Sequence, residues 1–228
     1  IKVAVLDSGI DSDHSQLDGQ IASGGYDYVN SDGDPEDDNG HGTHVAGIIA
    51  AEKTGTGMHG VCPNCDIIPL KVMNANSPAT GKWADISSAI DRARSQGAKV
   101  INMSLGGSNP NYSTVETAIK AATDAGIIIV SAAGNDGNAY APSYPASYAK
   151  DSDVCADALC ISVGNVNSSN ALYSDSNIAG ATMKNYHVMA PGTSIYSTTY
   201  DGSYGNMTGT SMAAPHVAGA VALLLEEF

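Results

Sequence analysis

Basic residues are scarce in this 228-residue sequence. Ten Lys and Arg stand against 24 Asp and Glu, so the formal net charge is −14. A field of this sign repels phosphate backbones, which argues against nucleic acid as a partner, and it favours cation binding and solubility. No apolar run approaches the length of a bilayer span, which argues against a membrane as a partner. There is no signal peptide, so for an exported protein we expect this segment to have been removed or left out.

Aromatic residues other than tyrosine are almost absent, with a single Phe and a single Trp. Hydrophobic residues still make up 43% of the chain, enough for a substantial core that is mostly aliphatic. The length suits one large α/β domain or two small ones. The sequence contains no internal repeat, low-complexity linker or break in composition. We therefore expect a single domain over residues 1–228.

Cysteine is limited to two close pairs, Cys62/Cys65 and Cys155/Cys160. Four cysteines allow three connectivities. A Pro-Asn turn dipeptide inside the first pair could bring its two sulfurs together. A zinc site would require histidines at ligand spacing, and neither pair has one beside it. Two local disulfides are therefore favoured over free thiols or a thioredoxin-like redox pair, and disulfides indicate an oxidising, extracellular setting.

Apolar segments that read as strands alternate with amphipathic segments that read as helices. Runs such as Ile1–Leu6 lack polar alternation, as expected of strands buried on both faces of a parallel sheet. Strand–helix alternation implies right-handed crossovers. The predicted fold is α/β, with a mainly parallel central sheet, helices on both faces and three layers. We expect strands over 1–6, 66–72, 99–105, 127–130, 160–163 and 188–192, helices over 83–96 and 114–125, and a hairpin over 196–206 that turns at Asp201-Gly202.

Three side chains with catalytic chemistry lie far apart in the sequence. Asp7 follows the first strand, at the sheet edge where ligands gather in open α/β folds. His41 begins one predicted helix, and Ser211 begins another, whose apolar run reaches Leu225. The alternatives are a turn-forming role for Asp7 and an ordinary N-cap role for Ser211. His41 and His44 could share a metal on one helix face, but no HExxH pattern is present, so His44 is expected to be a buried histidine.

An acidic loop lies between Gly24 and Asn39. Carboxylate oxygens in a segment bent by Gly and Pro are what a hard cation of calcium size requires. The spacing is not that of an EF-hand, so a solvated acidic loop remains the alternative. The predicted metal ligands are Asp27, Asp32, Asp34 and Glu36.

Three contiguous blocks contain the residues with catalytic chemistry: Asp7-Ser8-Gly9, His41-Gly42-Thr43-His44-Val45-Ala46-Gly47 and Gly209-Thr210-Ser211-Met212-Ala213-Ala214-Pro215-His216. These blocks resemble the signature blocks of the subtilisin-like serine proteases (subtilases). Their order is specific to that family, and lesser matches extend the resemblance over almost the whole chain. The resemblance implies a secreted serine endopeptidase that is made as a zymogen and works through an acyl-enzyme. The alternation of strands and helices agrees with the fold that this family implies.

The resemblance also assigns the catalytic roles. His41 would take the proton from the Ser211 hydroxyl and pass it to the leaving amine, and Asp7 would hold the imidazole tautomer and stabilise the imidazolium. Asn135 would be the side-chain oxyanion donor, beside the backbone N–H of Ser211. The alternative for Asn135 is a turn residue before Gly137.

Substrate-binding segments follow from the same resemblance. Ser104-Leu105-Gly106 would pair with the extended substrate backbone, and Ala132-Ala133-Gly134 would form the opposite wall of the primary specificity pocket. Both are small or apolar, which predicts broad specificity with a preference for large uncharged P1 side chains. Asp136 could bias the rim towards a basic side chain, and Trp83 either lines a more distant subsite or packs at a helix start. Expected partners are extended polypeptides and a pro-segment or protein inhibitor, with the protein itself a monomer.

Two calcium sites are at issue in the resemblance. The stretch from Tyr26 to His41 resembles a thermitase-like loop in length and pattern, which supports structural calcium at the four acidic ligands. The family's tighter site is matched less well, because its aspartate falls on Gln16 and its loop falls on Glu52–Met58, without the usual asparagine. Gln16 and backbone carbonyls could still bind, with an affinity lowered by the lost charge.

The family usually has a lead-in segment before the first strand and further elements after the serine helix. The chain is therefore either trimmed at both ends or an unusually short version. A catalytically silent relative that binds peptide strands is the main rival, and the intact triad with Asn135 argues against it. An α/β-hydrolase esterase would place its histidine after its serine and would need Gly-x-Ser-x-Gly, which Gly209–Ala213 lacks. A dinucleotide enzyme would need Gly-x-Gly-x-x-Gly after the first strand, and none is present.

Overall fold

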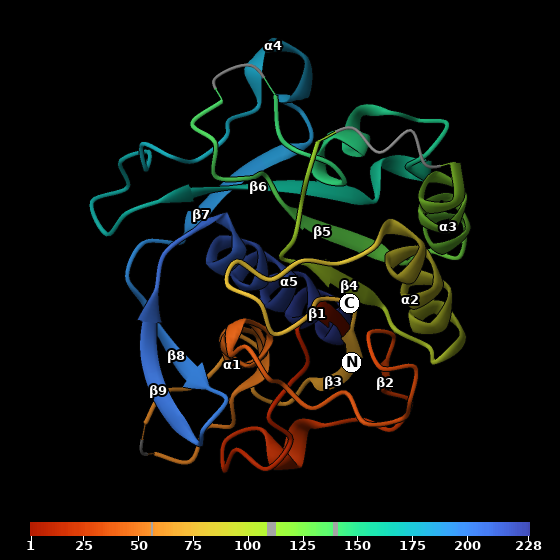
Figure 1. The fold of residues 1–228 in the computed structure, drawn as a ribbon. Helices are drawn as coiled ribbons and strands as arrows, with labels where there is room; N and C mark the ends of the chain where they lie inside the picture. Colours follow the sequence, from red (N-terminus) through yellow and green to blue (C-terminus); the bar gives the residue numbers. More distant parts are fainter. Residues whose placement is uncertain (56, 109–112, 139–140) are drawn as a thin grey trace.

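Seven parallel strands form one central sheet, drawn across the middle of Figure 1. The computed structural model describes residues 1–55, 57–108, 113–138 and 141–228. Thr56, which belongs to the second predicted calcium loop, lies outside the described residues. In spatial order the strands are β2 (Tyr26–Asp27), β3 (Asp66–Lys71), β1 (Lys2–Asp7), β4 (Val100–Met103), β5 (Ile128–Ala132), β6 (Cys160–Val166) and β7 (His187–Pro191).

Two pairs of helices cover the sheet, one pair on each face. Alternate residues of the strands enter two separate hydrophobic cores: in β1, Ala4 and Leu6 belong to the core beneath α2 and α3. Val3 and Val5 belong to the core beneath α1 and α5. Burial of both faces explains the unbroken apolar strands, and the predicted three-layer α/β fold is confirmed. The helices are α1 (His41–Ala50), α2 (Trp83–Ser95), α3 (Ser113–Asp124) and α5 (Thr210–Glu227).

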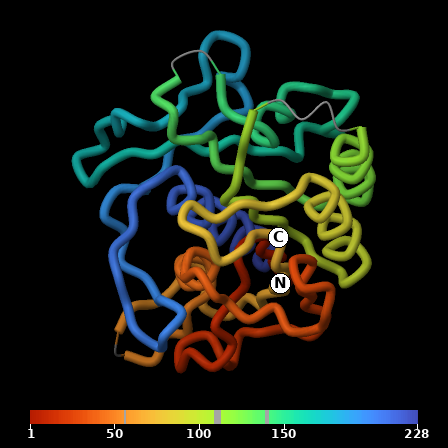
Figure 2. Tube along the Cα trace, viewed as in Figure 1, coloured from red at the N-terminus to blue at the C-terminus, as the bar shows by residue number. Residues whose placement is uncertain are grey.

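Shorter elements connect these layers, and Figure 2 traces their path along the chain. The predicted hairpin is confirmed as an antiparallel pair whose turn contains Asp201 and Gly202. None of the described helices is long and apolar enough to cross a membrane. The elements are η1 (Asp18–Gln20), η2 (Ala146–Lys150), η3 (Ala156–Ala158), α4 (Gly180–Met183), β8 (Ile195–Thr199) and β9 (Ser203–Met207).

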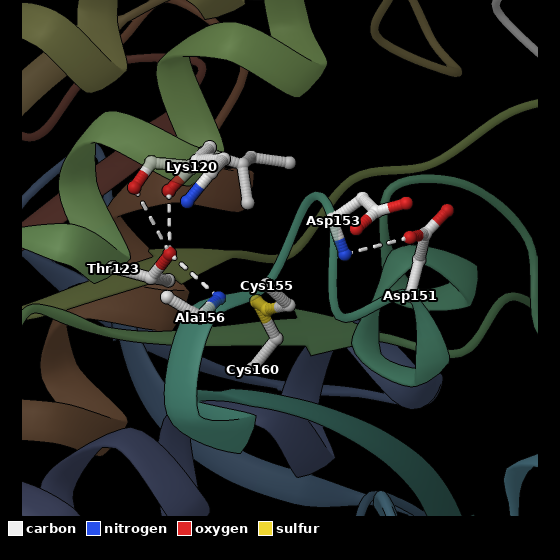
Figure 3. Close-up of a disulfide and its surroundings, with 8 residues drawn as sticks. Lys120, Thr123, Asp151, Asp153, Cys155, Ala156 and Cys160 are labelled. Carbon is white, nitrogen blue, oxygen red and sulfur yellow. Dashed lines mark hydrogen bonds between the residues drawn. A yellow bond between two sulfur atoms is a disulfide. The ribbon is translucent and has the colours of Figure 1, made fainter.

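Both predicted disulfides are present, Cys62–Cys65 and Cys155–Cys160. The second closes a short loop beside α3 (Figure 3). There the Thr123 hydroxyl accepts a hydrogen bond from the backbone N–H of Ala156 at 3.0 Å, which ties the end of α3 to η3.

Some predicted strand limits differ from the structure. The strand expected over 99–105 ends at Met103, so the substrate-binding segment begins just beyond the sheet. The strand expected over 160–163 continues to Val166, because β7 supplies a parallel partner up to Pro191. The two-residue strand β2 was missed, because it lies at the edge of the acidic loop and has no periodicity of its own.

Candidate active site

Asp7 and His41 meet at the carboxyl edge of the sheet. Asp7 ends β1 and is 1% exposed, and its Oδ1 lies 2.7 Å from Nδ1 of His41, the first residue of α1. The backbone N–H of Ser8 donates to the same oxygen at 2.8 Å. The start of α1 can approach this closely because Gly42 has no side chain; a Cβ there would lie 2.1 Å from the carbonyl oxygen of Gly9. Two of the three predicted triad members are thus in direct contact.

The carboxylate also sets the acid–base behaviour of His41. Burial lowers the pKa of the imidazole, but the charge of Asp7, its hydrogen bond and the charge of Asp37 outweigh that effect, so the pKa of His41 lies above its ordinary value. A base must be neutral to accept a proton. Activity that depends on neutral His41 is therefore lost as the pH falls through this raised pKa.

Asp37, which the sequence reasoning did not single out, organises the start of α1. It is 5% exposed, and its carboxylate accepts hydrogen bonds from the backbone N–H groups of Asn39, Gly40 and Thr43 at 2.9–3.0 Å. It also accepts from the Thr43 hydroxyl at 2.6 Å and the Ser8 hydroxyl at 2.8 Å. A carboxylate at a helix N-terminus is favourable because it satisfies unpaired N–H groups. The sequence signal that could have identified Asp37 is an aspartate placed just before the predicted start of a helix.

Lys71 holds the same turn from the other side. Its side chain is fully buried at the end of β3, where its ammonium group donates to the carbonyl oxygen of Ser8 and, at 2.5 Å, to Asp38. Because buried charges require partners, this pair fixes the position of the ammonium group. Ser8 is thereby held at its N–H, its hydroxyl and its carbonyl, and it orients Asp7 beside His41.

Ser211 lies in the first turn of α5, at the same edge of the sheet. Its Oγ donates to the carbonyl oxygen of Ser104 at 3.1 Å, and the Ser104 hydroxyl donates to the carbonyl oxygen of Ser211 at 2.8 Å. No hydrogen bond between Ser211 and His41 is formed in this structure, although α1 and α5 pack against each other. The predicted nucleophile is therefore in the predicted place with its hydroxyl turned towards Ser104. Catalytic hydrogen bonds are often formed only once substrate is bound.

Asn135 follows β5 and is held by the residue before the serine. Its Oδ1 accepts from the backbone N–H of Thr210 at 2.9 Å and from the Thr210 hydroxyl at 3.1 Å. The same hydroxyl accepts from the Gly134 N–H at 3.1 Å. Within the described residues, Nδ2 of Asn135 makes no hydrogen bond, so the amide is fixed at its oxygen and can donate to a group outside the protein.

The predicted substrate segments lie on adjacent strand ends. Beyond Ser104–Gly106 the chain pairs Gly107 with Tyr144 through two backbone hydrogen bonds of 2.9 and 3.0 Å. Trp83 packs against the core below α2, and its ring would touch a Cβ at Gly107 at 3.5 Å. Trp83 therefore packs at the start of α2 and lies beside Gly107, and its role in a distant subsite stays a prediction.

Asp136 is tied back into the protein. Its carboxylate accepts from Asn177 Nδ2 at 3.1 Å and from the Ser143 hydroxyl at 3.3 Å, and both of these groups lie behind Gly134. Asn177 is 1% exposed and also donates to the carbonyl oxygen of Ala133. This wall of the predicted pocket is therefore backed by a polar cluster that the sequence reasoning missed.

The four predicted calcium ligands are not brought together as a ligand group. The Asp27 carboxylate accepts hydrogen bonds from the N–H groups of Val29 and Asn30 and from the Asn30 side chain, at 2.6–2.9 Å. Asp32 Oδ1 accepts from the Asp34 N–H, and Glu36 accepts from Ser12. In the described part of the chain no group of three or more His, Cys, Asp or Glu residues could hold a metal ion. The carboxylates of the acidic loop are instead engaged in hydrogen bonds with backbone and side-chain groups of the protein.

His44 is a buried histidine, as predicted. It is 0% exposed, and Nε2 lies 3.0 Å from the carbonyl oxygen of Ile195 and 3.2 Å from that of Gly205. Nδ1 has no partner among the described residues. Two carbonyl acceptors at Nε2 fix the tautomer with its proton there. Burial lowers the pKa of His44 to about 4, so this side chain stays neutral in the folded protein over most of the acidic range.

We expect the protein to lose stability as the pH falls from about 6.5 to about 4. Over this range the unfolded chain binds a proton at His44 and the folded protein does not. The free energy of unfolding therefore decreases as the pH falls. The pKa values of His187 and His216 are also lowered by burial and act in the same direction. Urea unfolding at pH 7 and pH 4.5 measures the effect, with His44→Gln as the comparison. The variant should lose about 2 kcal/mol less on acidification; an equal loss would contradict this account.

Comparisons with known proteins agree with this geometry. The sequence matches the subtilase family over residues 1–228. Thermitase of Thermoactinomyces vulgaris is 39% identical over 227 residues, which cover 99% of this chain and 75% of the relative. Subtilisin E of Bacillus subtilis (strain 168) is 44% identical over 232 residues, covering 100% of this chain and 56% of the relative. A crystal structure of a cold adapted subtilisin-like serine proteinase aligns with a TM-score of 0.83 and 35% identity, over 99% of this chain and 75% of that one.

Proposed function

Because the chain belongs to the subtilase family and is a serine endopeptidase of that family, we propose that it cleaves peptide bonds through an acyl-enzyme on Ser211. The observation that carries the proposal is the 2.7 Å contact between Asp7 and His41, at the sheet edge where Ser211 begins α5. A simple peptide-binding groove does not require a buried carboxylate that raises the pKa of an imidazole at the sheet edge where a serine begins a helix.

In the proposed first step, the Ser211 hydroxyl turns from Ser104 towards His41. As Oγ forms a bond to the scissile carbonyl carbon, its proton passes to Nε2 of His41, and Asp7 stabilises the resulting imidazolium. Nδ2 of Asn135 and the backbone N–H of Ser211 donate to the developing oxyanion. The carbon–nitrogen bond then breaks as His41 gives its proton to the leaving amine. Water then attacks the acyl carbon and gives its proton to His41. The bond from the carbon to Oγ breaks, and His41 returns the proton to Oγ, so the acid is released and Ser211 is regenerated.

A serine-directed phosphonate tests the proposal against a catalytically silent peptide binder. The enzyme should be labelled once per molecule, at Ser211, with loss of all peptidase activity. The label should fail to react after thermal unfolding, because the reaction depends on the assembled site. A native protein that stays unlabelled and hydrolyses no peptide would defeat the endopeptidase proposal.

Substitution of Asn135 by leucine is expected to lower kcat by about 10²–10³-fold with little change in KM. The leucine keeps the side-chain volume and removes the Nδ2 donor. It also removes the acceptor of the Thr210 N–H and hydroxyl, so the melting temperature is measured beside the kinetics to separate this structural loss from the loss of the oxyanion donor. Steady-state kinetics on one peptide substrate provide the measurement, and Asn64→Leu, at an exposed turn far along the chain, is the matched control. A variant whose KM rises while kcat is unchanged would place Asn135 in substrate binding instead.

We further propose broad specificity with large uncharged P1 side chains preferred. The pocket walls, Ser104–Gly106 and Ala132–Gly134, carry no charge, and the Asp136 carboxylate is engaged by Asn177 and Ser143. That engagement supports the uncharged preference over the basic one that Asp136 alone would suggest. A cleavage profile on a peptide library decides between the two.

The remaining proposals concern the setting of the enzyme. Two disulfides support secretion into an oxidising environment. Partners would be extended polypeptides and a pro-segment or protein inhibitor bound in the same cleft, with the enzyme itself a monomer. Calcium at Asp27, Asp32, Asp34 and Glu36 stays a prediction from the sequence, because the loop conformation described above gives it no support.

A further inference from the structure

Gln16 is a buried side chain in the loop between β1 and η1, and three oxygen atoms from described residues converge on its amide nitrogen. It is 3% exposed. Nε2 lies 2.6 Å from the carbonyl oxygen of Met58, 3.2 Å from that of Glu52 and 3.3 Å from the Thr54 hydroxyl. Oε1 accepts from the Met58 N–H at 3.4 Å, and the backbone of Gln16 accepts from the Glu52 N–H at 2.8 Å. One side chain thus ties the described residues of the 52–58 segment, which are all but Thr56, to the N-terminal loop.

The group that lies between these oxygens, the Gln16 amide nitrogen, is a hydrogen-bond donor. Carbonyl and hydroxyl oxygens that converge on one point repel each other unless something positive lies between them, either a cation or a polarised N–H group. Here the amide NH₂ occupies that point. A metal ion placed there would face the amide hydrogens and would lack an anionic ligand. Gln16 and its oxygens therefore do not fit the tighter calcium site of the family.

We propose that the Gln16 amide replaces a bound cation in closing the 52–58 segment, so that this segment is formed without metal. The surrounding contacts are consistent with a closed, metal-independent loop. Gly57 packs so tightly that a Cβ would lie 2.8 Å from both Gln16 Oε1 and the Tyr204 hydroxyl. The Gln16 N–H donates to Nδ1 of His14, whose other ring nitrogen lies 3.0 Å from the Ser203 carbonyl oxygen.

The 52–58 segment lies between two elements that position catalytic residues. The 52–58 segment directly follows α1, which begins with His41, and it touches the hairpin β8–β9, which leads to Ser211. In Figure 2 the N-terminal loop lies beside the hairpin at the lower edge of the molecule, where His14 contacts the Ser203 carbonyl oxygen. Gln16 therefore contacts the segment that follows the His41 helix and, through His14, the hairpin that precedes Ser211.

Amide hydrogen exchange and thermal unfolding test the proposal. Three proteins are compared, all carrying Ser211→Ala to prevent self-digestion and Asp32→Asn to remove any contribution of the acidic loop: the Gln16 parent, Gln16→Asp and Gln16→Asn. Each is measured in chelator and in millimolar calcium. The two variants shorten the side chain equally and differ only in charge, so Gln16→Asn is the matched control.

In the Gln16 parent, exchange protection over residues 52–58 and the melting temperature should be the same in chelator and in calcium. In chelator, both variants should lose this protection and melt roughly 5 °C lower, because Asp offers no N–H donor and the Asn amide is one methylene too short to reach all three oxygens. Calcium should restore protection and melting temperature in Gln16→Asp, whose carboxylate leaves room for an ion, and should leave Gln16→Asn unchanged.

Three results would overturn the proposal. The first is loss of 52–58 protection in the Gln16 parent on chelation, which would show that a cation holds the segment. The second is an unaltered melting temperature in Gln16→Asn, which would show that the amide does not hold it. The third is an equal calcium response in the two variants, which would show that the oxygens do not form a cation cradle. If a variant fails to fold, the comparison of the Gln16 parent in chelator and calcium still decides.

Discussion

Replacement of Ser211 by alanine is expected to lower kcat by about 10⁶-fold, the size of loss that removal of the nucleophile causes in subtilisin itself. Without Oγ no acyl-enzyme can form, and His41 has no hydroxyl from which to take a proton. The oxyanion donors and the substrate groove remain, so some rate enhancement over water should survive. Peptide binding should be retained, with a dissociation constant close to the KM of the parent enzyme.

The measurement for this variant is single-turnover hydrolysis of a fluorogenic peptide, with residual activity tested for phosphonate sensitivity to detect contaminating parent enzyme. Because the Ser211 hydroxyl makes one hydrogen bond, to Ser104, the melting temperature should change by no more than a few degrees. Ser95→Ala, which removes a hydroxyl from the exposed end of α2, is the matched control. Turnover within tenfold of the parent would refute the assignment of Ser211 as nucleophile.

Replacement of Asp7 by asparagine is expected to lower kcat by about 10⁴-fold. One carboxylate oxygen accepts from both His41 Nδ1 and the Ser8 N–H, and the other has no partner among the described residues. An asparagine that preserves the two hydrogen bonds must bury its NH₂ group without an acceptor. The reversed orientation turns an N–H towards both donors and forces the wrong imidazole tautomer. In either case the negative charge that stabilises the imidazolium is lost.

The pH dependence distinguishes this electrostatic role from a structural one. In the parent, Asp7 raises the pKa of His41 against the lowering effect of burial. Without the charge, burial dominates and the pKa falls, so the acidic limb of kcat/KM should move to lower pH in Asp7→Asn. Asp91→Asn removes an equal charge from an exposed pair with Arg94 and should leave the limb in place. A limb that stays put in both variants would contradict the assigned role of Asp7.

Much of the fold could be read from local patterns. The unbroken apolar strands predicted a parallel sheet with both faces covered, because an alternating sequence would have left one face in water. The hairpin around Asp201-Gly202 and the two disulfides could be predicted because their interacting residues are close in sequence. The strand β2 was missed because two residues carry no period.

The catalytic residues could be named from the sequence only through the resemblance of three blocks to one family. Spacing alone left Asp7, His41 and Ser211 with ordinary structural alternatives. The structure brings the first two into contact and places the third at the same sheet edge. Asp7 ends β1, and Ser104 and Asn135 follow β4 and β5, so all three lie at the carboxyl ends of parallel strands.

The sequence by itself therefore determined the layered architecture, the cysteine pairing and the identity of the candidate catalytic groups, because each depends on short-range periodicity or on a contiguous block. Only the tertiary structure decided how side chains distant in sequence share hydrogen bonds. It joined Asp37 and Lys71 around Ser8, turned the Asp27 carboxylate onto its own loop and placed the Gln16 amide among the oxygens of 52–58. The partner of a buried oxygen comes from a segment that is distant in sequence and near in space. A local sequence pattern therefore does not predict whether that partner is a donor, a cation or absent.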